Sequence, residues 1–246
     1  MINQSPLLQP FSEEQIEFFK EQGYLLLKKG CSVQLADAFN GHVYDIRKQS
    51  PMPEWAACEE SKKYASRLFN PHVNDSFSRQ IMKLPVIRGG LAQLMGKEAV
   101  CVQSMYFYKE PGSPGQASHQ DYYYIKNDPM TMIAAWTAME DLVDEENGCL
   151  WVIPGSHKLG LLPHGAVKNL EEHEHWTDET EGVDTSKQMP VIMEKGDILF
   201  FSELLIHSSN KNRSIDRWRR SYVCHYIRED SVSLYNAKER LKFSLS

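Results

Sequence analysis

Apolar residues recur at helical spacing in the first part of this 246-residue chain. A capping-box pattern opens at Ser12, and Gly23 stands where the helix that it begins would end. Pro85 falls in the first turn of a later helix, where a missing N–H costs little. The elements expected before residue 99 are helices from Ser12 to Gln22, over 33–48 and over 84–91, a strand over 24–27, and an irregular stretch over 50–75.

From about residue 99 the periodicity changes to that of strands. Along residues 100–109, Gln103, Met105, Phe107 and Lys109 share one face of a period-two alternation. Many short strands, separated by turn residues and with no clear helix between them, favour an antiparallel sandwich or barrel with the helices outside it. Further strand-like runs lie at 130–140, 149–153, 190–194, 197–201 and 221–227.

Residues 160–189 fit neither pattern. They are polar and acidic, with Glu171 and Glu172 followed by a run that alternates histidine and glutamate. A loop of this length within a compact domain is usually a lid or a binding loop. The chain as a whole, residues 1–246, has the length and apolar content of one domain, and a lid or loop over 160–189 is expected within it.

The composition of the chain argues against some classes of binding partner and indicates a cellular compartment. The net charge of −6, without a lysine- and arginine-rich run, argues against nucleic acid and against an anionic membrane. No stretch approaches the roughly 20 apolar residues of a membrane helix, and the N-terminus lacks the pattern of a secretory signal. The 5 cysteines are scattered, with no C-x-x-C pair, which favours reduced thiols and a cytoplasmic protein.

A candidate metal site begins with His119 and Asp121. On a strand, residues two apart point the same way, so these two would present an imidazole nitrogen and a carboxylate oxygen to one point. A second histidine, His207, follows an apolar run that suits a distant strand of the same fold. Two histidines and one carboxylate form the facial triad of non-haem iron(II) oxygenases, although zinc also takes such ligands.

The surroundings of these residues resemble the phytanoyl-CoA dioxygenase family. The resemblance implies a mainly β fold with flanking helices, a double-stranded β-helix (jelly roll, cupin-like) whose core spans 99–228 and whose helical support is 1–98. It also implies iron(II) held by His119, Asp121 and His207. The segments that carry it are QSMYFYK (103–109), HQD (119–121), AWTAME (135–140), NGCLWVIPGSH (147–157), MEKGD (193–197) and LLIH (204–207).

The same resemblance implies a site for 2-oxoglutarate, whose distal carboxylate needs a buried cation. Arg219 fits the family's arginine, because His225 follows six residues later, but its distance from His207 is one residue longer than expected, so Arg217 and Arg220 are possible substitutes. On a strand Arg220 points away from the face that Arg219 shares with His225, whereas Arg217 has the parity of Arg219 and stays open. The other residues expected near the cosubstrate are Lys109, Trp136 and Ser209, with Gln103 on the strand face of Lys109. His225 is expected to be a core or supporting group and not a ligand.

The implied enzyme is a dioxygenase that uses iron(II), 2-oxoglutarate and O₂. It would hydroxylate a C–H bond of a small organic substrate with release of succinate and CO₂. The presence of Asp121 argues against a halogenase within this resemblance. The alternatives are a non-catalytic or zinc-binding jelly roll and a zinc hydrolase, and the second would need a general base that the sequence does not identify. The sequence does not specify the substrate, since the tyrosines at 122–124 and the loops around the pocket carry no clear pattern.

Overall fold

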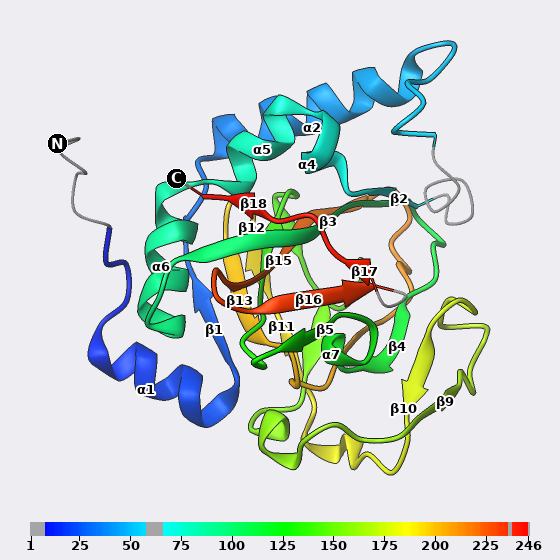
Figure 1. Ribbon diagram of the computed structural model, residues 1–246. Coiled ribbons are helices and arrows are strands. Elements are labelled where there is room, and N and C mark those ends of the chain that lie inside the picture. Colours follow the sequence, from blue (N-terminus) through cyan, green and yellow to red (C-terminus); the bar gives the residue numbers. More distant parts are fainter. Residues whose placement is uncertain (1–7, 58–65, 236–237, 246) are drawn as a thin grey trace, which may run out of the picture.

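Two antiparallel sheets face each other in the computed structural model, which describes residues 8–57, 66–235 and 238–245 (Figure 1). Within these residues the larger sheet has seven strands: β1 (Tyr24–Leu27), β13 (Ile198–Ser202), β6 (Ile133–Ala138), β15 (Arg219–Arg228), β3 (Ala99–Lys109) and β18 (Phe243–Ser244) in this order, with β2 (Arg67–Phe69) also paired to β3. The smaller sheet has the order β11 (Met189–Val191), β8 (Leu150–Val152), β14 (His207–Ser209) and β4 (Gln116–His119).

The inner faces of the two sheets meet in an apolar core. Phe107, Trp136 and Val223 of the larger sheet pack with Leu150 and Val152 of the smaller sheet, and all five are buried. Their spacing follows the period of two along each strand, which is how a sandwich buries one face of each sheet. The predicted mainly β architecture with two facing sheets is therefore present.

Helices cover the outer face of the larger sheet, where a second apolar cluster surrounds Phe39 and Phe200 (Figure 1). The predicted start and stop of the first helix are correct: Ser12 accepts from the amide of Gln15, and Gly23 ends the helix with a φ of 81°. The helices are α1 (Glu13–Gln22), α2 (Val33–Lys48), α4 (Pro71–Asn74), α5 (Ser76–Met82) and α6 (Pro85–Met95).

The acidic segment 160–189 contains more structure than the sequence predicted. It holds a two-stranded antiparallel sheet of β9 (His164–Ala166) and β10 (Asp178–Thr180), which lies at the opposite end of the molecule from α2 (Figure 1). The hydroxyls of Tyr123 and Tyr124 donate to Asp178 of β10, and Thr177 and Thr180 are buried. The sequence predicted a lid or loop here and did not indicate these two strands.

The remaining strands of the described residues form two further small antiparallel sheets, one of Leu142–Val143 with Met193–Glu194 and one of Lys126–Asp128, Val232–Tyr235 and Lys238–Glu239. None of the helices in the described part of the chain is long and apolar enough to cross a membrane. Cys31, Cys101, Cys149 and Cys224 are buried free thiols, as expected, whereas Cys58 lies outside the described residues. The remaining elements are α7 (Asp121–Tyr124), β5 (Lys126–Asp128), β7 (Leu142–Val143), η1 (Ser156–Leu159), η2 (Thr185–Lys187), β12 (Met193–Glu194), β16 (Val232–Tyr235) and β17 (Lys238–Glu239).

Candidate active site

Two histidines meet where β4 and β14 pair. His119 is the last residue of β4 and His207 is the first of β14, and the two are direct partners in the antiparallel register. Paired residues of neighbouring strands project from the same face of the sheet. Here that face looks into the space between the two sheets, so both imidazoles are buried and their ring centroids lie 4.1 Å apart.

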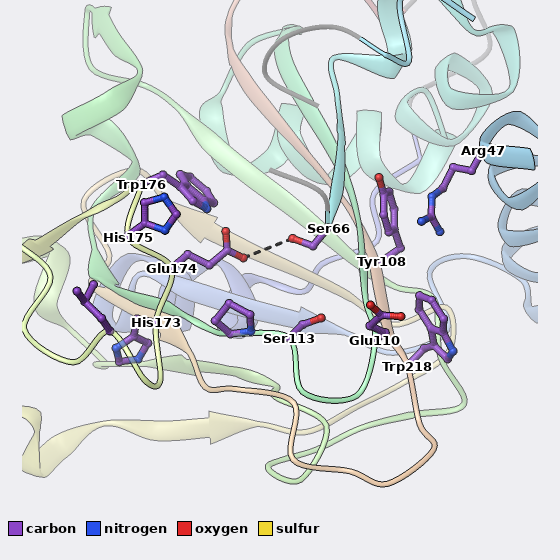
Figure 2. Close-up of a pocket in the computed structure, with 12 residues that line it drawn as sticks. Arg47, Ser66, Tyr108, Glu110, Ser113, His173, Glu174, His175, Trp176 and Trp218 are labelled. Carbon is purple, nitrogen blue, oxygen red and sulfur yellow. Dashed lines mark hydrogen bonds between the residues drawn. The ribbon is translucent and has the colours of Figure 1, made fainter. Parts of the chain in front are cut away.

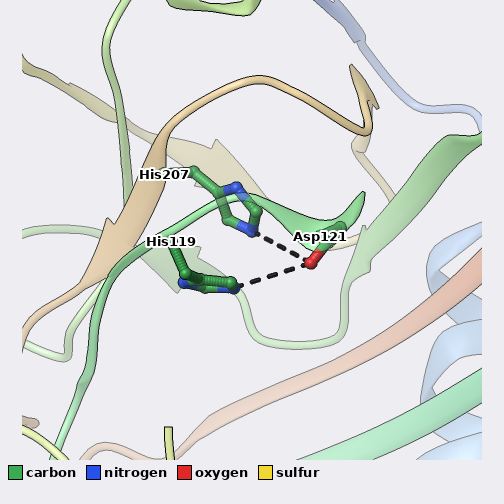
Figure 3. A group of neighbouring side chains, drawn as sticks. All are labelled: His119, Asp121 and His207. Atoms are coloured by element: carbon green, nitrogen blue, oxygen red, sulfur yellow. Dashed lines mark ion pairs between the residues drawn. The ribbon is translucent and has the colours of Figure 1, made fainter. Parts of the chain in front are cut away.

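Asp121 reaches the same point as the sequence predicted, although the strand ends before it. β4 ends at His119 and Asp121 is the first residue of the short helix α7, but Gln120 between them is extended, with φ −121° and ψ 126°, so the two side chains still point the same way. The buried amide of Gln120 holds this turn by donating to the carbonyls of Gly160 and Leu204, at 2.8 Å each. The carboxylate Oδ1 then lies 3.6 Å from Nε2 of His119 and 3.7 Å from Nε2 of His207 (Figure 3).

The tautomers of both histidines are set by the backbone. Nδ1 of His119 donates to the carbonyl of Ala117 at 2.8 Å, and Nδ1 of His207 donates to the carbonyl of Leu205 at 3.0 Å. Because a carbonyl only accepts, Nδ1 carries the hydrogen and the lone pair is on Nε2, which faces the carboxylate. Burial, with the nearby imidazole of His119, lowers the pKa of His207 to about 4, so this ring is neutral at pH 7.

His225 orients the carboxylate from the opposite sheet. Its Nε2 donates to Oδ2 of Asp121 at 3.1 Å, which leaves Oδ1 toward the two histidines. Burial acts to raise the pKa of Asp121, but the imidazoles around the carboxylate, that of His225 first, outweigh burial and hold this pKa well below its usual range. Metal binding requires an ionised carboxylate and imidazole nitrogens with a free lone pair, and Asp121 and His207 are in these states at pH 7. The three ligand atoms lie within 4.8 Å of one another.

A cavity extends from these three side chains along the inner face of the larger sheet. Of the cosubstrate residues expected from the sequence, it brings together Arg219, Trp136 and Ser209. Its wall is mostly apolar and aromatic, as is usual for pockets that exclude water. The residues that line it are Met105, Phe107, Gln116, His119, Asp121, Trp136, Leu150, Phe201, His207, Ser208, Ser209, Arg219, Val223 and His225.

Arg219 brings a buried positive charge to this cavity. Its side chain is 3% exposed and lies beside the rings of Phe107 and Trp136. Nη1 donates to the hydroxyl of Ser221 at 3.1 Å, but Nε has no hydrogen-bond partner among the described residues. Burial lowers the pKa of Arg219 to about 10, so the group is still cationic at pH 7. A buried donor and charge of this kind fit an anionic ligand in the cavity.

The two other arginines of this run point elsewhere. Arg217 forms ion pairs with Asp144 and Glu146, and Arg220 pairs with Glu140. Strand parity explains Arg220, because Arg219, Ser221, Val223 and His225 share the inner face of β15. Arg217 has the parity of Arg219 but lies before β15 begins. Arg219 is accordingly the arginine of this group that lines the cavity.

Two other expected residues do not line the cavity. Lys109 is buried, but its Nζ donates to the carbonyl of Pro114 at 2.7 Å and pairs with Glu174 at 3.2 Å. Gln103 is also buried, and its side-chain oxygen accepts from Arg240 at 2.7 Å. Both lie on the inner face of β3, as predicted from the alternation, and their role at the cosubstrate stays a prediction.

Sequence reasoning missed Gln116. Its amide Nε2 lies 3.0 Å from Nε2 of His119, on the side of the ring that faces the cavity. Regular alternation places residues three apart on opposite faces of a strand, but the register of β4 with β14 shifts between His207 and Ser209. This irregularity carries no signal in the sequence, so the position of Gln116 depends on the fold.

Comparison with known proteins gives the family. The family model for phytanoyl-CoA dioxygenase (PhyH) matches residues 19–221. The chain is 30% identical over 238 residues to the peroxisomal phytanoyl-CoA dioxygenase of Rattus norvegicus, covering 89% of this chain and 69% of the rat protein. It is also 30% identical over 250 residues to a probable phytanoyl-CoA dioxygenase of Caenorhabditis elegans, covering 92% of this chain and 78% of that protein. This chain belongs to the phytanoyl-CoA dioxygenase family.

Solved structures agree on the fold. The non-haem monooxygenase ThoJ superposes with a TM-score of 0.73 at 20% identity, covering 92% of this chain and 86% of that one. The epimerase SnoN, solved with Fe³⁺, α-ketoglutarate and nogalamycin RO, superposes with a TM-score of 0.70 at 19% identity, covering 89% and 84%. The jelly-roll fold, the family, the enzyme class and the cofactors predicted from the sequence are confirmed: the chain is a 2-oxoglutarate-dependent non-haem iron dioxygenase.

Proposed function

We propose that this dioxygenase hydroxylates a C–H bond of a small organic substrate, with conversion of 2-oxoglutarate to succinate and CO₂. One observation carries the proposal. Two imidazole Nε2 atoms and one carboxylate oxygen converge at one end of a cavity, and a buried arginine without an ion-pair partner among the described residues lines the same cavity. A metal ligand set and a carboxylate-binding cation in one enclosed space suit a metal-bound 2-oxo acid.

His119, Asp121 and His207 would hold iron(II). The bound metal and 2-oxo acid together supply the oxidising chemistry by activating O₂. The protein supplies the geometry: the carbonyls of Ala117 and Leu205 fix the two rings, and His225 fixes the carboxylate. Three protein ligands leave room at the metal for a bidentate cosubstrate and for O₂, whereas a structural zinc site is normally closed by four.

Arg219 would bind the distal carboxylate of 2-oxoglutarate. Its planar guanidinium matches a carboxylate with two parallel hydrogen bonds, and its burial strengthens the interaction. Trp136 and Phe107 would flank the carbon chain, and the hydroxyl of Ser209 lies at the same cavity. The apolar lining excludes water, which keeps the charge pair strong.

The arrangement disfavours the rival functions. An inert or structural metal site has no need of a buried, unmatched arginine beside it. A zinc hydrolase needs a general base next to the metal, but His225, the additional titratable side chain on that side of the cavity, is hydrogen-bonded to Asp121. The substrate class beyond "small organic molecule", the cytoplasmic location and the single-domain organisation of 1–246 stay predictions.

Anaerobic titration tests the proposal. Iron(II) and 2-oxoglutarate together should give the weak visible charge-transfer band of this enzyme class, and iron(II) alone should not. Admission of air should then produce succinate. Asp121→Ala should abolish both the band and succinate, because the metal loses its carboxylate ligand. The absence of a band in the wild-type protein, or full succinate formation by Asp121→Ala, would contradict the proposed site.

A further inference from the structure

Three buried charged groups meet beyond the arginine end of the cosubstrate cavity. Lys109 and Arg219 are direct partners in the register of β3 and β15, and their side chains are 2% and 3% exposed. Two buried cations this close repel each other and lose hydration. The carboxylate of Glu174, itself 7% exposed, lies 3.2 Å from Nζ of Lys109 and balances one of the two charges. The second charge is left for a ligand carboxylate.

Glu174 is held rigidly although it belongs to the acidic segment 160–189. Its backbone amide donates to the carbonyl of Gly115 at 2.9 Å, and the amide of Gly115 donates back to the carbonyl of Glu172 at 2.7 Å. Gly115 in turn lies against the backbone of Ser209, so closely that a Cβ on it would be 1.9 Å from that carbonyl oxygen. The position of Glu174 is thereby fixed relative to β4 and β14, the strands that carry the two histidines.

The Lys109–Glu174 pair also separates two cavities. Phe107 and Arg219 line the inner, cosubstrate cavity, and Nζ of Lys109 lies 5.8 Å from the ring centroid of Phe107. Glu174 and Pro114, which contact Nζ of Lys109, line a larger outer cavity of about 550 Å³ (Figure 2). Other residues around this outer cavity are Ser66, Tyr108, Glu110, Ser113, Trp176 and Trp218.

We propose that the Lys109–Glu174 pair, which lies behind the lining residues Phe107 and Arg219, is the floor of the cosubstrate site and selects the length of the 2-oxo dicarboxylate. The inference rests on the proposed function and adds Glu174 to it as a specificity-determining residue. A diacid that is one methylene longer than 2-oxoglutarate, such as 2-oxoadipate, would carry its distal carboxylate past Arg219 toward the place that the Glu174 carboxylate holds. Two carboxylates cannot share one lysine there, so the longer diacid is rejected by charge as well as by space.

Removing the floor should therefore relax selectivity. In Glu174→Ala the inner cavity opens toward the outer one, and Lys109 becomes available to the longer diacid. Glu174→Asp keeps the ion pair and retracts the carboxylate by one methylene, which is the difference in length between the two diacids. Glu172→Gln is the matched control, because Glu172 lies on the same segment but its side chain pairs with Arg213.

The dissociation constants of 2-oxoglutarate and 2-oxoadipate are measured from the charge-transfer band of the anaerobic iron(II) protein. The ratio of the 2-oxoadipate constant to the 2-oxoglutarate constant should fall about tenfold or more in Glu174→Ala, the worth of one charge-assisted hydrogen bond, and by a smaller factor in Glu174→Asp. Glu172→Gln should keep the wild-type ratio. A gain of affinity for one ligand is not an effect that partial unfolding produces.

Two outcomes would overturn the inference: a wild-type ratio in both Glu174 variants, or an equal fall in Glu172→Gln. The Glu174→Asp variant decides the matter if Glu174→Ala does not fold. Failure of the proposed function would look different, since the wild-type protein would then give no band with 2-oxoglutarate at all. A normal wild-type band with unchanged ratios removes Glu174 from the site and leaves the dioxygenase intact.

Discussion

Arg219→Met removes the cation that we assign to the distal carboxylate of 2-oxoglutarate. Methionine has a similar length and fills the space between Phe107 and Trp136 with an apolar chain. In the complex, the cosubstrate carboxylate would then be buried without its charged partner. Breaking a buried ion pair from one side costs about 3–5 kcal/mol, so the dissociation constant of 2-oxoglutarate should rise by roughly two to four orders of magnitude.

The charge-transfer band of the anaerobic iron(II) protein reports this affinity directly. Arg219→Lys should lose less, since it keeps the charge but not the planar fork. Arg217→Met and Arg220→Met are the matched controls, because these side chains pair with Asp144 and Glu140 away from the cavity. Both controls should bind 2-oxoglutarate as the wild-type protein does. If Arg219→Met binds normally and a control does not, the cosubstrate site has been assigned to the wrong arginine.

The stability of the ligand-free variant separates lost binding from lost folding. The buried guanidinium of Arg219 has an Nε without a partner among the described residues, so its burial costs free energy that methionine does not cost. The thermal midpoint of ligand-free Arg219→Met should equal or exceed that of the wild-type protein. A large fall in the midpoint would mean that Arg219 stabilises the fold through contacts beyond its hydrogen bond to Ser221.

Three further predictions concern His225, Gly115 and His72. His225→Phe removes the hydrogen bond to Oδ2 of Asp121 and should weaken iron(II) binding about 10–100-fold in a metal titration; unchanged affinity would show that the carboxylate needs no such support. Gly115→Ala places a Cβ 1.9 Å from the carbonyl oxygen of Ser209 and should lower the free energy of unfolding by about 3 kcal/mol. The control is Gly41→Ala on the exposed face of α2, where the new Cβ has no atom within 4 Å; it should raise the free energy of unfolding by about 0.5–1 kcal/mol. Burial, with the charge of Arg79, lowers the pKa of His72 from 6.5 to about 4 in the folded protein. Between these two pH values His72 is protonated in the unfolded chain but not in the folded protein, so the free energy of unfolding falls as the pH falls from 6.5 toward 4. The contribution of this group is about 3 kcal/mol, and His72→Gln should flatten the denaturant-midpoint profile over that range; an unchanged slope would contradict the assignment.

The parts of the fold that the sequence predicted are those governed by local periodicity and capping. Alternation along residues 100–109 correctly gave the inner face of β3, with Phe107 toward the other sheet. The capping box at Ser12 and the glycine at 23 correctly bounded α1. In each case the signal and the structure lie within the same few residues, so no knowledge of the tertiary fold is needed.

The parts that it could not predict depend on contacts between distant segments. Asp121 points with His119 as expected, but it starts α7, a helix that the sequence did not indicate, and the buried amide of Gln120 holds the turn between them. The two-stranded sheet of 160–189 is stabilised from outside, where Tyr123 stacks on His164 at 4.1 Å and donates to Asp178 at 3.0 Å. An acidic run gives no local indication of either contact.

Side chains from both sheets build the candidate metal site, so the packing between the sheets affects its geometry. His119 and His207 come from the smaller sheet, whereas His225, which orients Asp121, comes from the larger sheet. The position of His225 relative to Asp121 therefore depends on the apolar layer of Val152, Phe201 and their neighbours between the sheets. Close-packed cores transmit the strain of a volume change, so a substitution in this layer should alter metal affinity without replacing a ligand. Substitutions of equal volume in the cluster between the helices and the outer face of the larger sheet should alter stability alone.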